Sequence, residues 1–386
     1  MSSLETKPHF IILDALRGVA ALIVIWYHCF EGFATSIADQ GCNHGYLAVD
    51  FFFILSGFVI GYAYDDRLRN GALTTKGFFK RRLIRLHPMV IFGAIFGVLC
   101  FVIGGRQNWD GDIIPVSMVM LAMLLNMLML PVIPGTRADV RGNGEMFPLN
   151  GPNWSLFFEY IGNIFYVLLL RKLPTKILAI LTAALGCTLA AMTIRSGYLG
   201  IGWTLPEFWG GMIRMMFPYC AGMLLARLFV KRSEKGIKPI LPAIIRKYAF
   251  LICSAVLLIL LPMPFIGHET QLWQNGLYVS LIILFVFPAL IWTAAEGSGT
   301  ESGSIKEKAM TLLGELSYPL YAIHYPVMYL FYKHIGFPNV HTTMAESWIL
   351  AICTAAGCII FAYFVLKFYD KPLRKRLSSV KTTSSF

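Results

Sequence analysis

Three ionisable side chains interrupt the first long apolar stretch of the sequence. Asp14, Arg17 and His28 lie within residues 11–30, which are otherwise apolar and long enough to cross a bilayer. A charged group inside a membrane span costs roughly 2.5–3.5 kcal/mol, so such groups need partners or a function. In a helix, Arg17 and His28 point the same way about 16 Å apart, and Asp14 lies one turn before Arg17. We therefore expect a polar, functional face. The alternative is an Asp14–Arg17 ion pair near the bilayer surface, with His28 bonded to a neighbouring helix.

The second apolar run, residues 47–64, carries an acid and a serine. Asp50 lies near the expected outer end, and Ser56 and Gly57 lie about 9 Å deeper in a helix. Asp50 is either a site residue or an interfacial carboxylate. Small residues let membrane helices approach closely, so close packing is the simpler interpretation of Ser56 and Gly57.

Two arginines begin the third apolar run, residues 84–104. Arg82 and Arg85 are one helical turn apart and share a face. The guanidinium group is a rigid fork of donors that suits phosphate, so this pair is a candidate grip for a phosphorylated ligand. An ordinary basic anchor at a cytoplasmic membrane surface explains the charges without requiring the spacing.

A carboxylate enters the membrane region again at Glu159. It lies about 9 Å along a helix that starts near Asn153, at a depth comparable with that of His28. We expect His28 as its partner, because a carboxylate orients an imidazole and raises its basicity. The alternative is a structural bond from Glu159 to Trp154 or to a serine of another helix.

The segment SYPLYAIHYP, residues 317–326, combines two prolines with His324. Prolines in a membrane helix free backbone carbonyls and often mark a kink that lines a cavity. His324 is expected in the outer half of its span, near the depth of His28. Taken alone, it is as consistent with a structural role as with a functional one.

The composition indicates that these residues lie on membrane helices. The chain has 386 residues, 57% of them hydrophobic, and a mean hydropathy of +0.65, which predicts an all-α polytopic membrane protein. The net charge of +12 does not imply a nucleic-acid partner, because the location of Lys and Arg matters more than their sum in such a protein. The eight cysteines show neither a disulfide framework nor a metal-binding spacing.

Eleven apolar runs have spanning length, and the charges of the loops indicate how many cross. The runs are residues 11–30, 47–64, 84–104, 114–133, 153–170, 174–194, 210–230, 241–262, 273–295, 310–332 and 346–366. If the run 114–133 does not cross, every basic cluster falls on the cytoplasmic side, as the positive-inside rule requires. We therefore predict ten spans with both termini cytoplasmic, and a re-entrant or internally packed segment at 114–133.

We expect one integral-membrane domain over residues 1–386, with a core at about 10–372 and a basic, polar cytoplasmic tail at 373–386. The longest outer segment, residues 134–153, could border a substrate site.

Taken together and in order, these motifs resemble the membrane-bound acyltransferase 3 family over roughly residues 10–372. The resemblance lies in Arg17 and His28 as Arg-x10-His, VDFFFILSGF at 49–58, Arg82 and Arg85 as Arg-x-x-Arg, NWSL at 153–156 followed by Glu159, and SYPLYAIHYP at 317–326.

The resemblance implies transfer of an acyl group, usually acetyl, from cytoplasmic acyl-CoA to a hydroxyl of an extracytoplasmic acceptor, commonly a carbohydrate. It implies a bacterial plasma membrane and no permanently bound cofactor or metal. Some family members carry a C-terminal esterase-like domain. Only about twenty residues follow the last span here, so we expect handover to a separate protein or directly to the acceptor.

Each candidate residue has an expected role. Arg82 and Arg85 hold the CoA phosphates, and Arg17 lines the pantetheine path or fixes its helix through Asp14. His28 is a general base or an acyl carrier, and Glu159 orients it or balances its charge. The further site candidates are Asp14, Asp50, Ser56, Trp154, Ser155, Ser317, Tyr321 and His324.

Two other classes of protein stay open. A proton-coupled transporter could use His28, Glu159, Asp50 and His324 as a proton relay. Against it, the two halves of the chain show no corresponding pair of broken helices. A non-catalytic assembly subunit would have no need of costly buried charges.

Overall fold

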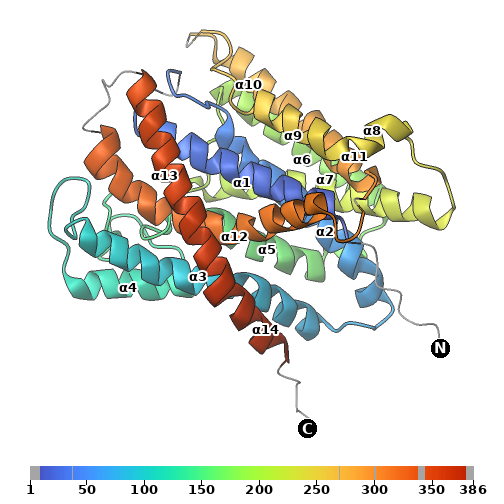
Figure 1. The fold of residues 1–386 in the computed structure, drawn as a ribbon, viewed down its shortest axis with the longest axis horizontal. Helices are drawn as coiled ribbons and strands as arrows, with labels where there is room; N and C mark the ends of the chain where they lie inside the picture. The colour runs from blue at the N-terminus through green and yellow to red at the C-terminus, as the bar shows by residue number, and fades with distance from the viewer. Residues whose placement is uncertain (1–8, 37, 269, 300, 338–343, 380–386) are drawn as a thin grey trace.

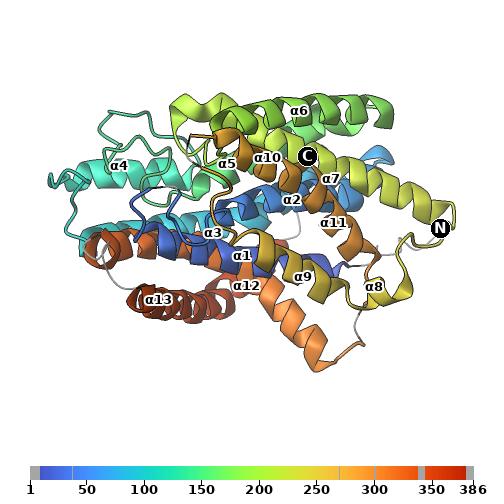
Figure 2. The same ribbon diagram turned by 90° about the horizontal axis from the view of Figure 1, so that it is seen from above.

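The computed structural model describes residues 9–36, 38–268, 270–299, 301–337 and 344–379, and these fold as a bundle of helices with two isolated β-bridges (Figure 1). The helices are α1 Ile11–Glu31, α2 Ala48–Arg69, α3 Thr75–Ile103, α4 Val116–Met127, α5 Asn153–Leu168, α6 Thr175–Ser196, α7 Phe208–Glu234, α8 Ala243–Lys247, α9 Ala249–Leu260, α10 Leu272–Leu281, α11 Phe287–Glu296, α12 Ile305–Phe331, α13 Met344–Val365 and α14 Lys371–Ser379. Figure 2 shows α6 and α13 on opposite sides of the molecule, with α1 and α2 between them.

Eight helical segments of the described chain are long and apolar enough to cross a membrane. Two of the ten expected spans are not among them. The run 241–262 forms the short α8 and the 12-residue α9, whereas α12 has 27 residues but carries many polar side chains. The multi-pass membrane class is confirmed, and the number of crossings stays a prediction.

The segment 114–133 forms the 12-residue helix α4, about 18 Å long and therefore shorter than the bilayer core. Val119 and Ala122 pack in a small apolar cluster with Phe101 of α3. Met120 and Leu124 are exposed, so α4 covers α3 with one face and is not enclosed by the protein.

Helices α1 and α12 run in parallel and pack closely. Gly18 makes the approach possible, because a Cβ there would lie 2.4 Å from the carbonyl oxygen of Leu313. We call the end where α1 and α12 begin the basic end, since Arg82 and Arg85 of α3 also lie there, and the end where α1 and α12 finish the loop end. Because α1 packs on α12, both Arg17 and His28 of α1 have neighbours on α12.

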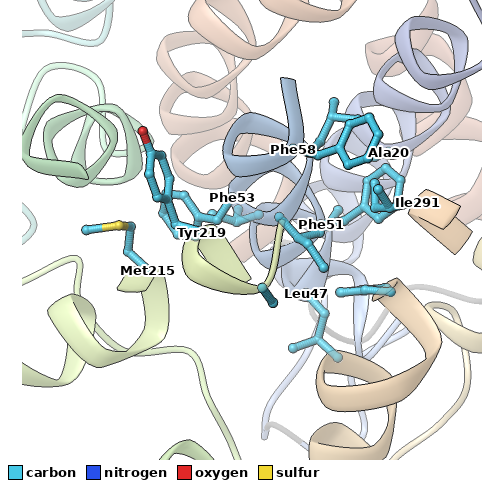
Figure 3. Close-up of a cluster of buried hydrophobic side chains, with 14 of the residues drawn as sticks. Ala20, Leu47, Phe51, Phe53, Phe58, Met215, Tyr219 and Ile291 are labelled. Carbon is cyan, nitrogen blue, oxygen red and sulfur yellow. The ribbon is translucent and has the colours of Figure 1, made fainter. Parts of the chain in front are cut away.

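A second close crossing joins α2 and α7 in the centre of the bundle. A Cβ on Gly57 would lie 2.0 Å from the carbonyl oxygen of Tyr219, so the two backbones touch. Figure 3 shows Phe53 of α2 beside Tyr219 of α7 in this buried core, and Phe51 and Phe58 of α2 in the same cluster. The expectation of close packing at Gly57 is confirmed.

Local signals fix both the start and the middle of α12. Ser304 Oγ accepts a hydrogen bond from the Glu307 amide at 3.1 Å, which is half of a capping box. Pro326 lacks the N–H that would bind the carbonyl of Ala322, and the Asn150 side chain donates to that carbonyl at 2.8 Å instead. The carbonyl that a proline was expected to free is therefore used to attach the outer segment to α12.

Candidate active site

A cavity of about 110 Å³ lies between α1, α2, α3, α5 and α12, toward the basic end. Eight of the residues singled out in the sequence line it, namely Arg17, Ser56, Arg82, Arg85, Ser155, Glu159, Ser317 and Tyr321. The first three helices thus converge with α5 and with the distant α12 on one space. Its volume suits a slender chain and is too small for a nucleotide.

Glu159 holds Arg82 across the cavity. The Arg82 guanidinium forms an ion pair with Glu159 Oε1, and Ser56 Oγ donates to the same oxygen at 2.8 Å. Both charged side chains are mostly buried, with 12% and 17% of their surface exposed. Ser56 therefore contributes a hydrogen bond, while the adjacent Gly57 provides the close contact with α7.

Arg17 is fixed by three acceptors. One terminal nitrogen lies 3.0 Å from Asp14 Oδ1, Nε donates to Ser317 Oγ at 2.8 Å, and the other terminal nitrogen donates to the Gly314 carbonyl at 3.0 Å. The expected Asp14–Arg17 pair is confirmed. Asp14 also accepts from His9 Nε2 at 2.6 Å, and this hydrogen bond raises the pKa of His9, which precedes α1.

Arg85 is the uncommitted cation of the cavity. It makes no hydrogen bond and no ion pair with any residue that the structure describes, although it lines the same space as Arg82. Because Glu159 balances Arg82 and Asp14 balances Arg17, the charge of Arg85 is available to an anion.

The expected pairing of His28 with Glu159 is wrong. His28 Nδ1 lies 2.8 Å from Oε2 of Glu31, one turn further along α1, and the Tyr332 hydroxyl donates to the same oxygen at 2.8 Å. Glu159 is committed to Arg82 instead. The i,i+3 spacing of His28 and Glu31 was the available signal for this partner, and the apolar run that ends at residue 30 obscured it.

His324 of α12 lies beside His28 of α1. The ring centroids of the two histidines are 5.5 Å apart, and the Tyr325 ring packs 4.8 Å from His28. His324 Nδ1 donates to the Tyr321 carbonyl at 2.8 Å, which leaves Nε2 as the unprotonated nitrogen. That nitrogen is fully buried and has no hydrogen-bond partner among the described residues.

Tyr321 connects the cavity with the histidines. Its ring lies 5.6 Å from that of His324, and its hydroxyl is 2.7 Å from Ser155 Oγ. Neither His28 nor His324 lines the cavity itself. Tyr321 lines the cavity together with Arg85, and His324 and then His28 follow Tyr321 along the parallel helices α12 and α1.

Asp50 and Trp154 belong to a separate structural cluster. Asp50 is fully buried and forms an ion pair with Arg214 of α7 at 2.9 Å, and the Arg214 guanidinium lies 4.9 Å from the Trp154 ring centre. The interpretation of Asp50 as an interfacial carboxylate is therefore wrong. Asp50 and Glu159 sit in different ion pairs, so the four-residue proton relay of the transporter alternative is not assembled.

The fold and the cavity are those of a multi-pass helical membrane protein. Its arginine-lined cavity lies near a histidine–glutamate pair. The family model described as an acyltransferase domain matches residues 10–366, and the chain belongs to the acyltransferase 3 family. It is therefore an acyltransferase, whose reaction requires an acyl donor and an acceptor.

Three relatives illustrate the similarity. "Protein 2 in picA locus" of Rhizobium radiobacter is 36% identical over 42% of this chain and 84% of its own length. An inferred O-acetyltransferase of Staphylococcus aureus strain COL is 26% identical over 94% of this chain, which spans only 57% of that protein. Acyltransferase MdmB of Streptomyces mycarofaciens is 25% identical over 95% of this chain and 92% of its own length. No solved structure matches.

Proposed function

We propose that the protein transfers an acetyl group from cytoplasmic acetyl-CoA to a hydroxyl of an acceptor on the other side of the plasma membrane, most simply a surface carbohydrate. The observation that carries this proposal is that Tyr321, which lines the cavity together with Arg85, is the ring neighbour of His324, which in turn lies beside the His28–Glu31 pair. The name of the streptomycete relative supports an acyl transfer, and that of the staphylococcal relative supports transfer of acetyl to oxygen.

The basic end is proposed to receive the donor. Arg85 and Arg82 would contact the CoA phosphates, and the slender cavity would take the pantetheine arm, with Arg17 at its side. The nucleotide would remain outside the cavity, in the cytoplasm. This orientation agrees with ten crossings and two cytoplasmic termini, because the basic clusters then face the cytoplasm.

His28 is proposed as the general base. With Nδ1–H donated to Glu31, Nε2 carries the lone pair that accepts the proton of the acceptor hydroxyl. The hydroxyl oxygen forms the new ester bond to the acetyl carbonyl carbon as the carbon–sulfur bond breaks. The departing CoA thiolate then takes a proton, which returns His28 to its neutral form. Direct acylation of His28 is the alternative order of the same steps.

The experiment follows release of free CoA from acetyl-CoA by purified protein in nanodiscs, with crude surface glycan as acceptor. His28→Ala is expected to lower the rate by about 10²-fold to 10⁴-fold. His268→Ala, which removes an exposed histidine that lines neither cavity, is the matched control and retains most of the rate. Wild-type turnover in His28→Ala would exclude both the base and the acyl-carrier roles. Acetyl trapped on His28 without acceptor would favour the carrier.

A further inference from the structure

A second cavity, of about 210 Å³, lies at the loop end, between the end of α3 and the loop 104–111 that follows it, the end of α12, and Arg141 of the segment 134–153. Its polar lining comes from Gln107, Asn108, Arg141 and Lys333, and Trp109 and Tyr329 add aromatic surface. Among the residues that the structure describes, the lining holds two cations and no carboxylate. Planar aromatic faces beside fixed polar groups are the usual lining of a small-molecule site.

Arg141 is held in an aromatic cage. Its guanidinium lies 3.6 Å from the ring centre of Tyr329, 4.8 Å from that of Phe101 and 5.4 Å from that of Trp109. The residue is 95% buried, since 5% of its surface is exposed, and its Nε donates to the Pro148 carbonyl at 3.1 Å. The two terminal nitrogens make no hydrogen bond with any described residue. A cation so buried and preorganised, with free donors beside a cavity, is suited to a bidentate anion.

Lys333 supplies the second charge. Its Nζ donates to the Gly104 carbonyl and to Gln107 Oε1, both at 2.6 Å, so one of its three N–H groups is left for a ligand. Glu145, a buried carboxylate of the same outer segment as Arg141, does not line the cavity. Its oxygens accept from the Tyr329 hydroxyl and from Asn143 at 2.7 Å, and burial raises the pKa of Glu145. Both charged side chains in the described lining of the cavity are thus cations.

A single aromatic ring, that of Tyr325, lies between His28 and the cavity residue Tyr329. The Tyr325 ring packs 4.8 Å from His28 and 4.7 Å from Tyr329, and Tyr329 in turn packs on Arg141. His28 does not line this cavity, so an acceptor with its anionic group on Arg141 would have to extend past Tyr325 for its hydroxyl to meet the imidazole.

We propose that this cavity binds the phosphate or carboxylate of the acceptor, so that the acceptor is an acidic hydroxyl compound such as a phosphorylated or acidic sugar. This inference rests on the proposed function, because it assigns the acceptor side of the same reaction. Trp109 provides the face on which the sugar ring stacks, and Arg141 and Lys333 hold the anion.

The test is calorimetric titration of the full chain in nanodiscs of zwitterionic lipid with a matched pair of probes, N-acetylglucosamine 1-phosphate and N-acetylglucosamine. The phosphorylated probe is expected to bind at least about tenfold more tightly. Arg141→Gln removes that preference. Arg137→Gln, an exposed arginine of the same outer segment, keeps it and serves as the matched control.

Two further variants, Arg141→Lys and Lys333→Gln, test the same site if Arg141→Gln does not fold. Arg141→Lys retains the charge but loses the fork of donors, so the preference falls only in part.

A polyprenyl phosphate added to the nanodisc lipid distinguishes the source of the anion. Competition with the sugar phosphate indicates a lipid-linked acceptor, and lack of competition indicates a soluble one; both support an anionic subsite.

Equal affinity for the two probes, or an undiminished preference in Arg141→Gln, overturns the inference. Acetyl-CoA titrated into the same samples reports the proposed function separately. Donor binding and CoA release without a preference for the phosphorylated probe would overturn the subsite alone. A phosphate preference in protein that neither binds nor cleaves acetyl-CoA would overturn the proposed transfer and leave an anion site.

Discussion

Glu159 forms its ion pair with Arg82 of α3, whereas His28 is hydrogen-bonded to Glu31 of its own helix. This arrangement assigns the two carboxylates to different tasks. Glu159 positions an arginine of the proposed donor cavity, and Glu31 orients the imidazole. In the proposed mechanism, donor binding and proton transfer therefore depend on separate residues and should be separable by mutation.

The Arg82–Glu159 pair should be visible as a coupling energy. Removing either partner leaves a mostly buried charge without compensation, so Arg82→Ala and Glu159→Ala should each destabilise the protein by about 3 kcal/mol. The double variant should recover part of that loss, giving a coupling of roughly 1–3 kcal/mol. Unfolding in a denaturing detergent series measures all four proteins. Strictly additive losses would show that the two side chains do not interact.

Glu31→Gln should impair the chemical step and spare the donor. The amide can present its N–H to His28 Nδ1 and so favour the wrong tautomer, which should lower kcat on the order of 10²-fold. Affinity for acetyl-CoA should stay within about twofold. Tyr332→Phe, which removes only the second donor to Glu31, is the milder comparison. Equal rates in Glu31→Gln and wild type would leave Glu31 without a catalytic role.

The Asp50–Arg214 pair should matter for stability and not for transfer. Asp50 is completely buried, so Asp50→Ala strands the Arg214 charge and should cost about 3–5 kcal/mol. The apparent melting temperature in nanodiscs should drop, while acetyl-CoA affinity of the remaining folded protein should not change. A loss of donor affinity at unchanged melting temperature would place Asp50 in the site.

The crossing of α2 and α7 should be intolerant of a single methyl group. Gly57→Ala places a Cβ against the backbone of Tyr219, and relief of that overlap should cost about 1–3 kcal/mol. Gly357→Ala is the matched control, because a Cβ at Gly357 meets no atom within 4 Å. Thermal unfolding compares the two; equal melting temperatures would contradict the close crossing.

His44 should make stability depend on pH. Burial lowers the pKa of His44, which lies between α1 and α2 with its ring nitrogens 2.9 Å from the Met263 carbonyl and 3.0 Å from Asn275 Oδ1. The unfolded state then binds the proton more tightly, so this stability is complete above about pH 6.5 and is lost as the pH falls toward the lowered value. Between pH 7.5 and pH 5, wild type should lose more thermal stability than His44→Gln. Parallel losses would show that another group is responsible.

Much of the site follows from the sequence, because charged residues in apolar helices are costly and have to converge on something. Helical spacing predicted that Arg82 and Arg85 share a face, and both line one cavity. It also predicted the Asp14–Arg17 pair, since both residues lie on the same helix.

Partners on different helices were harder to predict. The depth of Glu159 along its helix matched that of His28, but depth leaves the rotation of each helix and the choice of neighbours open. Arg214 and Arg141 carried no motif, and only the packing of α7 and of the outer segment reveals that both are buried. Local spacing would have identified Glu31; long-range packing was needed for Arg214.

The most direct test of the central claim is calorimetric titration of acetyl-CoA into the purified chain in nanodiscs. Wild type and His28→Ala should bind with the same affinity, whereas Arg85→Gln should bind at least about tenfold more weakly. Lys76→Gln, an exposed cation at the start of the same helix, should bind as wild type does. Absence of saturable binding in folded wild-type protein, or equal affinity in Arg85→Gln, would contradict the proposed donor site.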